Sequence, residues 1–187
     1  WQVFDFQDQE GLWNSIINCV YEDRSGNIWI GTNGDGLSRF TNERFVHHQD
    51  FPGSGLTFAI TRQDNGEYWI GTGDGISTYD GHAFRPLEGD PAATKGYIMN
   101  LMRDRRGHTW ISSFTGLYRY DGEQYELIPL RKGKEEAPIV LSTYEDRSGD
   151  IWIASKIGFF IYRGDSVIDL ARENAAFNTY GLQIRED

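Results

Sequence analysis

The chain has 187 residues, of which 14% are aromatic and 25% charged, as in a globular protein and unlike a disordered one. Its formal net charge of -10 argues against a nucleic-acid surface, because phosphate binding needs clustered lysine and arginine, and it suits a neutral ligand such as a sugar, or a cation. A single cysteine, Cys19, excludes an internal disulfide, and no apolar run approaches the ~20 residues that span a bilayer, so we expect no membrane segment within the chain.

The predicted elements recur four times along the chain. The stretch DRSGNIWIGTNGDGLSRF, which starts at Asp23, returns as QDNGEYWIGTGDGISTY, DRRGHTWISSFTGLYRY and DRSGDIWIASKIGFFIY. The central tryptophans are Trp29, Trp69, Trp110 and Trp152, in steps of 40, 41 and 42 residues. Self-similarity at such a period indicates a repeat architecture.

Each repeat is expected to begin with a β-rich strand and a tight turn. The first strands cover residues 16–21, 57–61, 98–102 and 139–144. A glycine stands three residues before each central tryptophan, where a positive φ is expected: Gly26, Gly66, Gly107 and Gly149. Three copies carry an aspartate six residues before the tryptophan, which is expected to accept backbone N–H groups of the turn: Asp23, Asp104 and Asp146. The second copy departs, with Gln63 there and Asp64 next.

Three further strands complete each repeat. The second strand (28–30, 68–70, 109–111, 151–153) carries consecutive apolar residues, so both of its faces are expected to be buried. The third strand (37–40, 76–79, 117–120, 159–162) follows a glycine, and a fourth lies near Phe45, Phe84, Tyr125 and Val167. Helical repeats of this period are disfavoured, because the segments are punctuated by glycine and rich in β-branched residues.

Four short antiparallel strands every ~40 residues predict an all-β fold, a β-propeller. We expect one domain over residues 1–187, with four full four-stranded blades at about 13–51, 55–90, 96–130 and 138–170 and partial strands at both ends. Residues 1–6 resemble a fourth strand, and Gly11-Leu12 and Gly181-Leu182 resemble the Gly55-Leu56 that precedes a first strand. Such ends predict a piece of a larger propeller, whose open blade faces would drive self-association or leave an open arc.

The run GLWNSIINCVYEDRSGNIWIGTNGDGLSRF resembles the two-component-regulator propeller repeat. In that family a Gly-Leu lead-in and a strand precede Asp-Arg-x-Gly-x-x-Trp-Ile-Gly-Thr, then Gly-Gly-Leu and an aromatic residue. The first two copies keep Trp-Ile-Gly-Thr, and the later ones have Trp-Ile-Ser-Ser and Trp-Ile-Ala-Ser. The resemblance implies the periplasmic or other extracytoplasmic sensor region of a membrane-anchored bacterial two-component or hybrid histidine kinase receptor, whose ligands are often glycan fragments.

Several patterns that suggest chemistry have a simpler structural interpretation. The Asp-x-x-Gly-x-x-Trp element recurs in every repeat, which favours a turn over a carboxylate site. The glycine-rich run 31–36 joins two strands and lacks the dinucleotide spacing, so no cofactor is predicted. His47 and His48 would point to opposite faces of a strand, so no metal is predicted. Residues 131–136 are interpreted as a solvated loop between blades.

Candidate ligand-binding residues lie on loops that open on one face of a propeller. Loops between second and third strands, and segments that lead into first strands, are where binding residues concentrate on such a scaffold. They supply Trp13, Asn14, Asn33, Asp35, Asp74, Tyr97, Thr115 and Lys156. An exposed indole at Trp13 would suit sugar stacking, and the alternative is that Trp13 packs a blade junction.

These patterns favour a non-catalytic binding module that recognises a small-molecule ligand, with a glycan fragment as one candidate. A glycan-acting propeller hydrolase or lyase is an alternative, since two convergent carboxylates would suffice. A pure assembly scaffold is a third, because fold alone does not determine function.

Overall fold

A computed structural model describes residues 16–42, 44–48, 51–131 and 137–173. Within these residues, sixteen strands form four four-stranded antiparallel sheets, which are the four predicted blades. Blade 1 contains β1 (Ile17–Glu22), β2 (Ile28–Thr32), β3 (Leu37–Thr41) and β4 (Arg44–His47), and blade 2 contains β5 (Thr57–Arg62), β6 (Tyr68–Thr72), β7 (Ile76–Tyr79) and β8 (Phe84–Pro86). Blade 3 contains β9 (Ile98–Arg103), β10 (Thr109–Ser113), β11 (Gly116–Tyr120) and β12 (Tyr125–Leu127), and blade 4 contains β13 (Val140–Glu145), β14 (Ile151–Ser155), β15 (Gly158–Arg163) and β16 (Ser166–Asp169).

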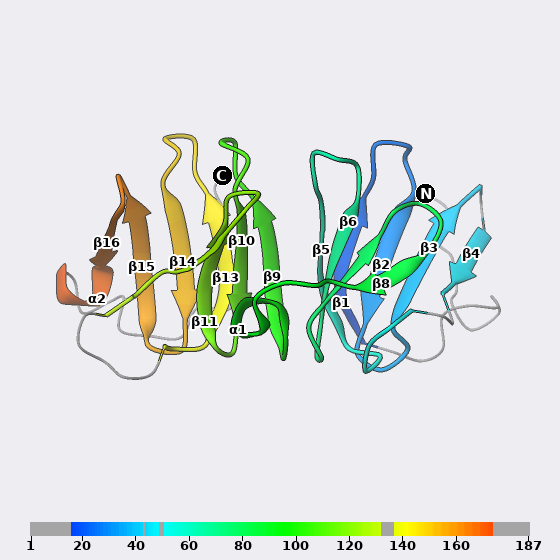
Figure 1. Ribbon diagram of the computed structural model, residues 1–187, viewed down its shortest axis with the longest axis horizontal. Helices are drawn as coiled ribbons and strands as arrows, with labels where there is room; N and C mark the ends of the chain where they lie inside the picture. Colours follow the sequence, from blue (N-terminus) through cyan, green and yellow to red (C-terminus); the bar gives the residue numbers. More distant parts are fainter. Residues whose placement is uncertain (1–15, 43, 49–50, 132–136, 174–187) are drawn as a thin grey trace.

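The blades stand side by side as an arc (Figure 1). In each sheet the strands follow chain order from the innermost to the outermost, so every connection within a blade is a hairpin. The innermost strands pack against one another in the order β1, β5, β9 and β13. The all-β propeller fold that the repeat pattern predicted is therefore confirmed.

A motif tryptophan in one blade packs against an aromatic residue of the next blade. The ring centroid of Trp29 lies 5.4 Å from that of Tyr79. Trp69 and Tyr120 are 5.3 Å apart, and Trp110 and Tyr162 are 5.1 Å apart. All three indoles are at least 96% buried, since their exposed fractions are 2%, 4% and 1%. Burying a large aromatic side chain contributes about 2–3 kcal/mol, so these contacts bind the blades to one another.

Glycine in the Trp-Ile-Gly-Thr motif allows close approach of the next inner strand. A Cβ added at Gly31 would lie 2.6 Å from the Cγ2 atom of Thr57, and one added at Gly71 would lie 2.9 Å from the Cγ2 atom of Ile98. Real Cβ atoms essentially never come this close. Blade 3 carries Ser112 at the same register position, so its junction with blade 4 accommodates a side chain there, and blade 4 carries Ala154.

The structure differs from the sequence prediction at several boundaries. The first strand of every blade extends to one residue beyond the predicted end, and β1 and β13 also begin one residue later. Two four-residue helices, α1 (Pro91–Thr94) and α2 (Leu170–Glu173), were not predicted. The Asp90 carboxylate caps α1 by accepting the N–H of Ala92 at 2.9 Å, a local bond that overrides the strand and loop pattern around it. The predicted terminal strands lie outside the described residues.

The blades have two chemically distinct ends (Figure 1). The turns that join first to second strands gather at the end drawn uppermost, which we call the turn end. The loops that join second to third strands, together with α1, gather at the opposite end, which we call the loop end.

Candidate functional site

At the turn end, the motif aspartates are occupied by hydrogen bonds within their own turns. Asp104 accepts the backbone N–H groups of Arg106 at 3.0 Å and His108 at 2.8 Å through Oδ1. Its Oδ2 accepts the indole N–H of Trp110 at 2.9 Å. Burial alone would raise the pKa of Asp104, but the hydrogen bonds from Trp110 and His108 outweigh it and lower this pKa below its usual value.

The same arrangement recurs in blades 1 and 4. The indole N–H of Trp29 donates to Asp23 at 3.0 Å, and that of Trp152 donates to Asp146 at 2.8 Å. The glycines of the four turns have φ angles of +77°, +91°, +90° and +86°, as the sequence predicted. A carboxylate engaged in this way has little capacity left for a substrate, so the motif holds the turn and orients the tryptophan.

Blade 2 is the exception, because Gln63 replaces the aspartate. The Gln63 side-chain oxygen accepts from Arg103 Nη1 at 2.8 Å and from the Thr109 hydroxyl at 2.9 Å, so it joins blade 2 to blade 3. The indole N–H of Trp69 and the side-chain NH₂ of Gln63 are buried and have no hydrogen-bond partner among the described residues. An unpaired buried donor is destabilising, so blade 2 has a weaker turn than its neighbours.

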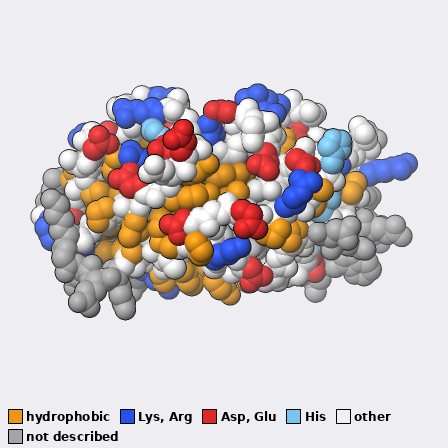
Figure 2. Space-filling view, viewed as in Figure 1, with side chains coloured by type: hydrophobic (Ala, Val, Ile, Leu, Met, Phe, Trp, Pro, Cys, Tyr) orange, Lys and Arg blue, Asp and Glu red, His pale blue; other side chains and the backbone are white. Residues whose placement is uncertain are grey.

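Ion pairs across the blade junctions also gather at the turn end. Arg103 pairs with Asp64 of the preceding blade, and Arg105 Nε lies 3.2 Å from Glu145 Oε2 of the following blade. Figure 2 shows basic and acidic side chains along the upper edge of the molecule, where the turns lie. These groups satisfy one another and join the blades together.

At the loop end, one hydroxyl in each blade builds the loop. It belongs to the last residue of the second strand, where the motif ends in threonine or serine. In blade 1 the Thr32 hydroxyl donates to the carbonyl of Gly36 at 3.1 Å and accepts the N–H of Asp35 at 3.1 Å. The same pair of bonds is made by Thr72, Ser113 and Ser155. The last residue of the motif therefore carries a hydroxyl in all four blades, whether the motif is Trp-Ile-Gly-Thr, Trp-Ile-Ser-Ser or Trp-Ile-Ala-Ser.

A backbone hydrogen bond then ties each loop to the segment leading into its own blade. The residue after the hydroxyl donates its N–H to a lead-in carbonyl, and the four pairs are Asn33 to Ile16, Gly73 to Leu56, Phe114 to Tyr97 and Lys156 to Ile139. The same two positions therefore protrude from every blade, but they carry different side chains. This row is where the chain can vary recognition without changing the scaffold.

Blades 2, 3 and 4 together form an exposed aromatic ledge, which we define as Phe58, Tyr97, Phe114 and Lys156. The rings of Tyr97 and Phe114 stack with centroids 4.8 Å apart and planes 22° apart, yet their exposed fractions are 42% and 40%. Phe58 extends the stack, 6.2 Å from Tyr97. Lys156 Nζ lies 5.8 Å from the centre of the Phe114 ring. The ledge offers flat apolar faces beside one cation.

Six of the eight predicted ligand-binding residues lie on the loops and lead-in segments of this row, and their role in binding stays a prediction. Tyr97 and Lys156 lie within the ledge. Asp74 lies on the neighbouring loop of blade 2, and its carbonyl accepts the N–H of Gly96 at 3.2 Å. Asn33 and Asp35 lie on the loop of blade 1, at the other end of the row. Trp13 and Asn14 lie outside the described residues.

Thr115 and Phe114 show what the sequence reasoning missed. The Thr115 hydroxyl donates to the carbonyl of Ala92 at 2.9 Å, so it serves the fold. Its neighbour Phe114, which was not among the predicted residues, is 40% exposed and stacks on Tyr97 in the ledge. The signal was present, since Phe114 aligns with Lys156 when the four copies are superimposed on their tryptophans.

Two other sequence features are resolved by local packing. His48 stacks on Trp29 with centroids 5.4 Å apart, and burial, aided by the positive charges of Arg39 and His47, lowers the pKa of His48 to about 4. Arg131 was expected in a solvated loop, but Nε donates to Asp169 at 3.1 Å and Nη2 donates to the carbonyl of Ile157, which half-buries the side chain. Arg131 is therefore less solvated than the loop interpretation implied, and residues 132–136 lie outside the described residues.

No group of three or more metal-binding side chains occurs among the residues that the structure describes. None of the helices in the described ranges has the length and hydropathy that crossing a bilayer requires.

Comparison with known proteins supports the fold and identifies one family repeat within the chain. The fold is that of propeller domains, in which four-stranded blades pack face to face. Residues 11–34 match the family described as "Two component regulator propeller". The chain therefore contains the repeat of this family, as the sequence resemblance predicted. No curated protein matches the chain in sequence.

Solved structures share the fold at low identity. The extracellular domain of the putative hybrid two component system BT3049 from B. thetaiotaomicron is similar with a TM-score of 0.71 and 20% identity, over 91% of this chain and 26% of that one. The extracellular domain of BT4673 from the same organism gives 0.64 and 19%, over 82% and 24%. Inactive virginiamycin B lyase from Staphylococcus aureus gives 0.63 and 15%, over 82% and 54%. The chain spans about a quarter of the two extracellular domains and about half of the lyase.

Proposed function

We propose that the chain is a ligand-sensing segment of the extracytoplasmic region of a bacterial two-component receptor. The family match at residues 11–34 and the similarity to two extracellular domains of such systems support this proposal. In it, the propeller binds a small molecule and passes the signal through contacts with the rest of the receptor. The segment itself catalyses no reaction.

The observation that carries the binding role is the aromatic ledge. The side chains of Tyr97 and Phe114 stack on each other but remain 42% and 40% exposed. Aromatic side chains that serve only the fold bury more of their apolar area than this. Flat rings beside a polar group suit the apolar face of a sugar ring, and Lys156 adds a hydrogen-bond donor. The ligand class proposed is therefore a glycan fragment that stacks on the ledge.

A glycan array followed by calorimetry tests this proposal. Phe114→Ala and Tyr97→Ala are expected to weaken binding of any glycan that the chain recognises by about tenfold or more, the loss expected for one stacking ring. Lys156→Ala is expected to weaken it less, since Lys156 is exposed. Val46→Ala, at an exposed apolar residue of blade 1, is the matched control and should leave binding unchanged. Equal losses in the control and the ledge variants would contradict the ledge as the site.

An enzyme remains the second candidate, and the similarity to a virginiamycin B lyase favours it. Asp35 and Asp74 are the carboxylates on the loop row that could act on a ligand there. Turnover of a glycan, measured by chromatography and abolished by Asp35→Asn or Asp74→Asn, would establish catalysis and sink the sensor proposal. Binding of a glycan without turnover would support the sensor proposal.

A scaffold role is the third candidate, favoured by the open face of blade 1. Val20 is 61% exposed, whereas the residues at the same register position in blades 2 and 3, Ile60 and Leu101, are 8% and 5% exposed. We propose that this face mediates self-association through packing on another blade. Light scattering should give a multiple of the chain mass, and Val20→Glu should return the monomer, while the control Val46→Glu should not.

A further inference from the structure

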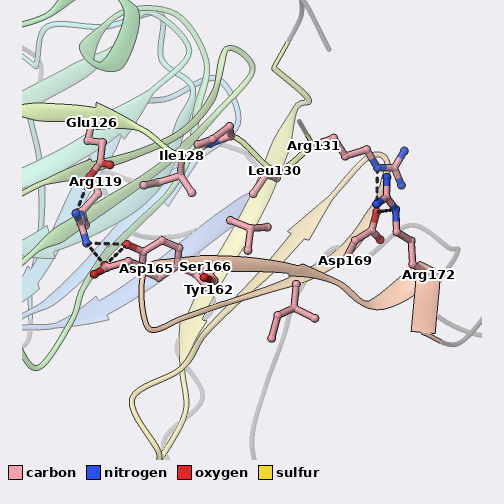
Figure 3. Close-up of a pocket in the computed structure, with 13 residues that line it drawn as sticks. Arg119, Glu126, Ile128, Leu130, Arg131, Tyr162, Asp165, Ser166, Asp169 and Arg172 are labelled. Atoms are coloured by element: carbon pink, nitrogen blue, oxygen red, sulfur yellow. Dashed lines mark hydrogen bonds and ion pairs between the residues drawn. The ribbon is translucent and has the colours of Figure 1, made fainter. Parts of the chain in front are cut away.

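A groove with a volume of about 850 Å³ lies at the rim between blades 3 and 4 (Figure 3). None of the residues that line it belongs to the aromatic ledge. The middle of the groove is apolar: Ile128 and Leu130, which follow β12, are 3% and 4% exposed, and Val167 of β16 packs in the same cluster. The volume falls within the range of ordinary ligand sites. Neither the motif nor the family match accounts for this groove.

The two ends of the groove carry opposite charge, as the ion pairs in Figure 3 show. At one end Arg119 Nη2 lies 2.6 Å from Glu126 and Arg119 Nη1 lies 3.6 Å from Asp165, so one cation faces two carboxylates. At the other end Arg131 and Arg172 lie 3.1 Å and 3.6 Å from Asp169, so two cations face one carboxylate. Among the described side chains that line the groove, the first end has one more carboxylate than cations, and the second end has one more cation than carboxylates.

One wall of the groove is the edge of a sheet. Within the described residues β16 pairs with β15 alone, so its outer side presents backbone donors and acceptors. Val167 and Asp169 alternate within β16 and share a face, whereas Asp165 lies in the turn just before the strand, with a φ of +60°. Asp165 and Asp169, one from each charged end, are four positions apart in the chain, with Val167 between them.

We propose that this groove binds an extended peptide segment of a partner protein, which pairs with β16 as an additional antiparallel strand. Such a strand would lie with an acidic residue at the Arg131 and Arg172 end and a basic residue at the Glu126 and Asp165 end. An apolar side chain between them would contact Val167, the partly exposed apolar residue over the buried Ile128 and Leu130. Because the three side chains must share a face, the recognised pattern is acidic-x-apolar-x-basic.

Fluorescence anisotropy with labelled, end-blocked peptides tests the proposal. The peptide SETVTKS carries the pattern, and SKTVTES is the same composition with the charges exchanged. We expect SETVTKS to bind at concentrations up to about 1 mM, the weak end of specific binding, and SKTVTES to bind at least about fivefold more weakly. No binding of SETVTKS, or a preference for SKTVTES, would overturn the proposal.

A charge exchange in the protein makes the test independent of folding. Arg172 is 79% exposed, so Arg172→Glu should fold normally, weaken SETVTKS binding about five- to tenfold and favour a peptide with lysine in place of the glutamate. The matched control is Arg44→Glu, an exposed arginine on the outermost strand of blade 1. A similar loss of SETVTKS binding in Arg172→Glu and Arg44→Glu would overturn the proposal. So would a change of solution mass in Arg172→Glu without peptide binding, which would make a second copy of this chain the occupant.

Discussion

The turn end and the loop end of the blades use their side chains in opposite ways. At the turn end, the Asp104 carboxylate accepts from two backbone N–H groups and from the indole of Trp110, and it is 8% exposed. At the loop end, Tyr97 and Phe114 protrude and contact each other, with about two-fifths of each side chain exposed. The comparison teaches that one repeat can use its polar side chains for stability at one end and leave side chains exposed at the other, because a buried hydroxyl and backbone groups hold each loop.

The largest effect is expected from breaking a turn. Asp104→Ala leaves the Trp110 indole and two backbone N–H groups without their acceptor and should lower the free energy of unfolding by about 3 kcal/mol. Urea denaturation followed by tryptophan fluorescence measures it. Asp121→Ala is the matched control, because Asp121 accepts two backbone N–H groups in an exposed turn and should cost about 1 kcal/mol or less. Equal costs would contradict the role given to the buried indole.

The turn should also respond to acid. The pKa of Asp104 is lowered in the folded state, so its contribution to stability is fully present above the unfolded value of about 4 and is lost as the pH falls through the lower folded value. Asp104→Asn removes this pH dependence. The difference in free energy of unfolding between the native chain and this variant should therefore shrink by about 1 kcal/mol on acidification below pH 4. Denaturation at a series of pH values checks it. A deficit that grows on acidification would show the opposite sign of linkage.

Repairing the exceptional turn of blade 2 should sharpen the comparison. Gln63→Asp supplies an acceptor for the unpaired Trp69 indole and should raise the free energy of unfolding by about 1 kcal/mol. The gain is limited because Gln63 also accepts from Arg103 and Thr109. Gln124→Asp, at an exposed glutamine, serves as the control for the added charge. A loss of stability in Gln63→Asp would mean that the bonds to blade 3 outweigh the missing indole bond.

The smallest effect on stability is expected at the loop end. Phe114→Ala should change the free energy of unfolding by less than about 0.5 kcal/mol, as for other exposed side chains. By contrast, Phe160→Ala, at a fully buried residue of the adjacent blade, should cost about 3–5 kcal/mol. The same denaturation assay measures both variants. A large loss for Phe114→Ala would make the ledge part of the core and not a recognition surface.

Local patterns in the sequence were sufficient for the architecture. The spacing of the tryptophans, the glycine in each turn and the paired apolar residues of the second strands all depend on near neighbours, so they predicted the four blades and the positive φ angles. The same patterns indicated that the motif aspartates accept backbone N–H groups. They did not reveal that each of these carboxylates also accepts a hydrogen bond from the tryptophan indole of its own repeat, because that bond depends on the side-chain direction in the next strand.

The proposed recognition surfaces depend on contacts between blades, which the sequence alone could not supply. The ledge joins Phe58, Tyr97, Phe114 and Lys156 from three blades, and the rim groove joins Arg119 with Asp165, residues that lie in different blades. The stacking of Phe114 on Tyr97 was also decided in three dimensions, since the two rings come from different segments of blade 3. The repeat determines where a blade begins and ends through short-range hydrogen bonds and periodicity. The packing of one blade on the next decides which side chains remain for a partner.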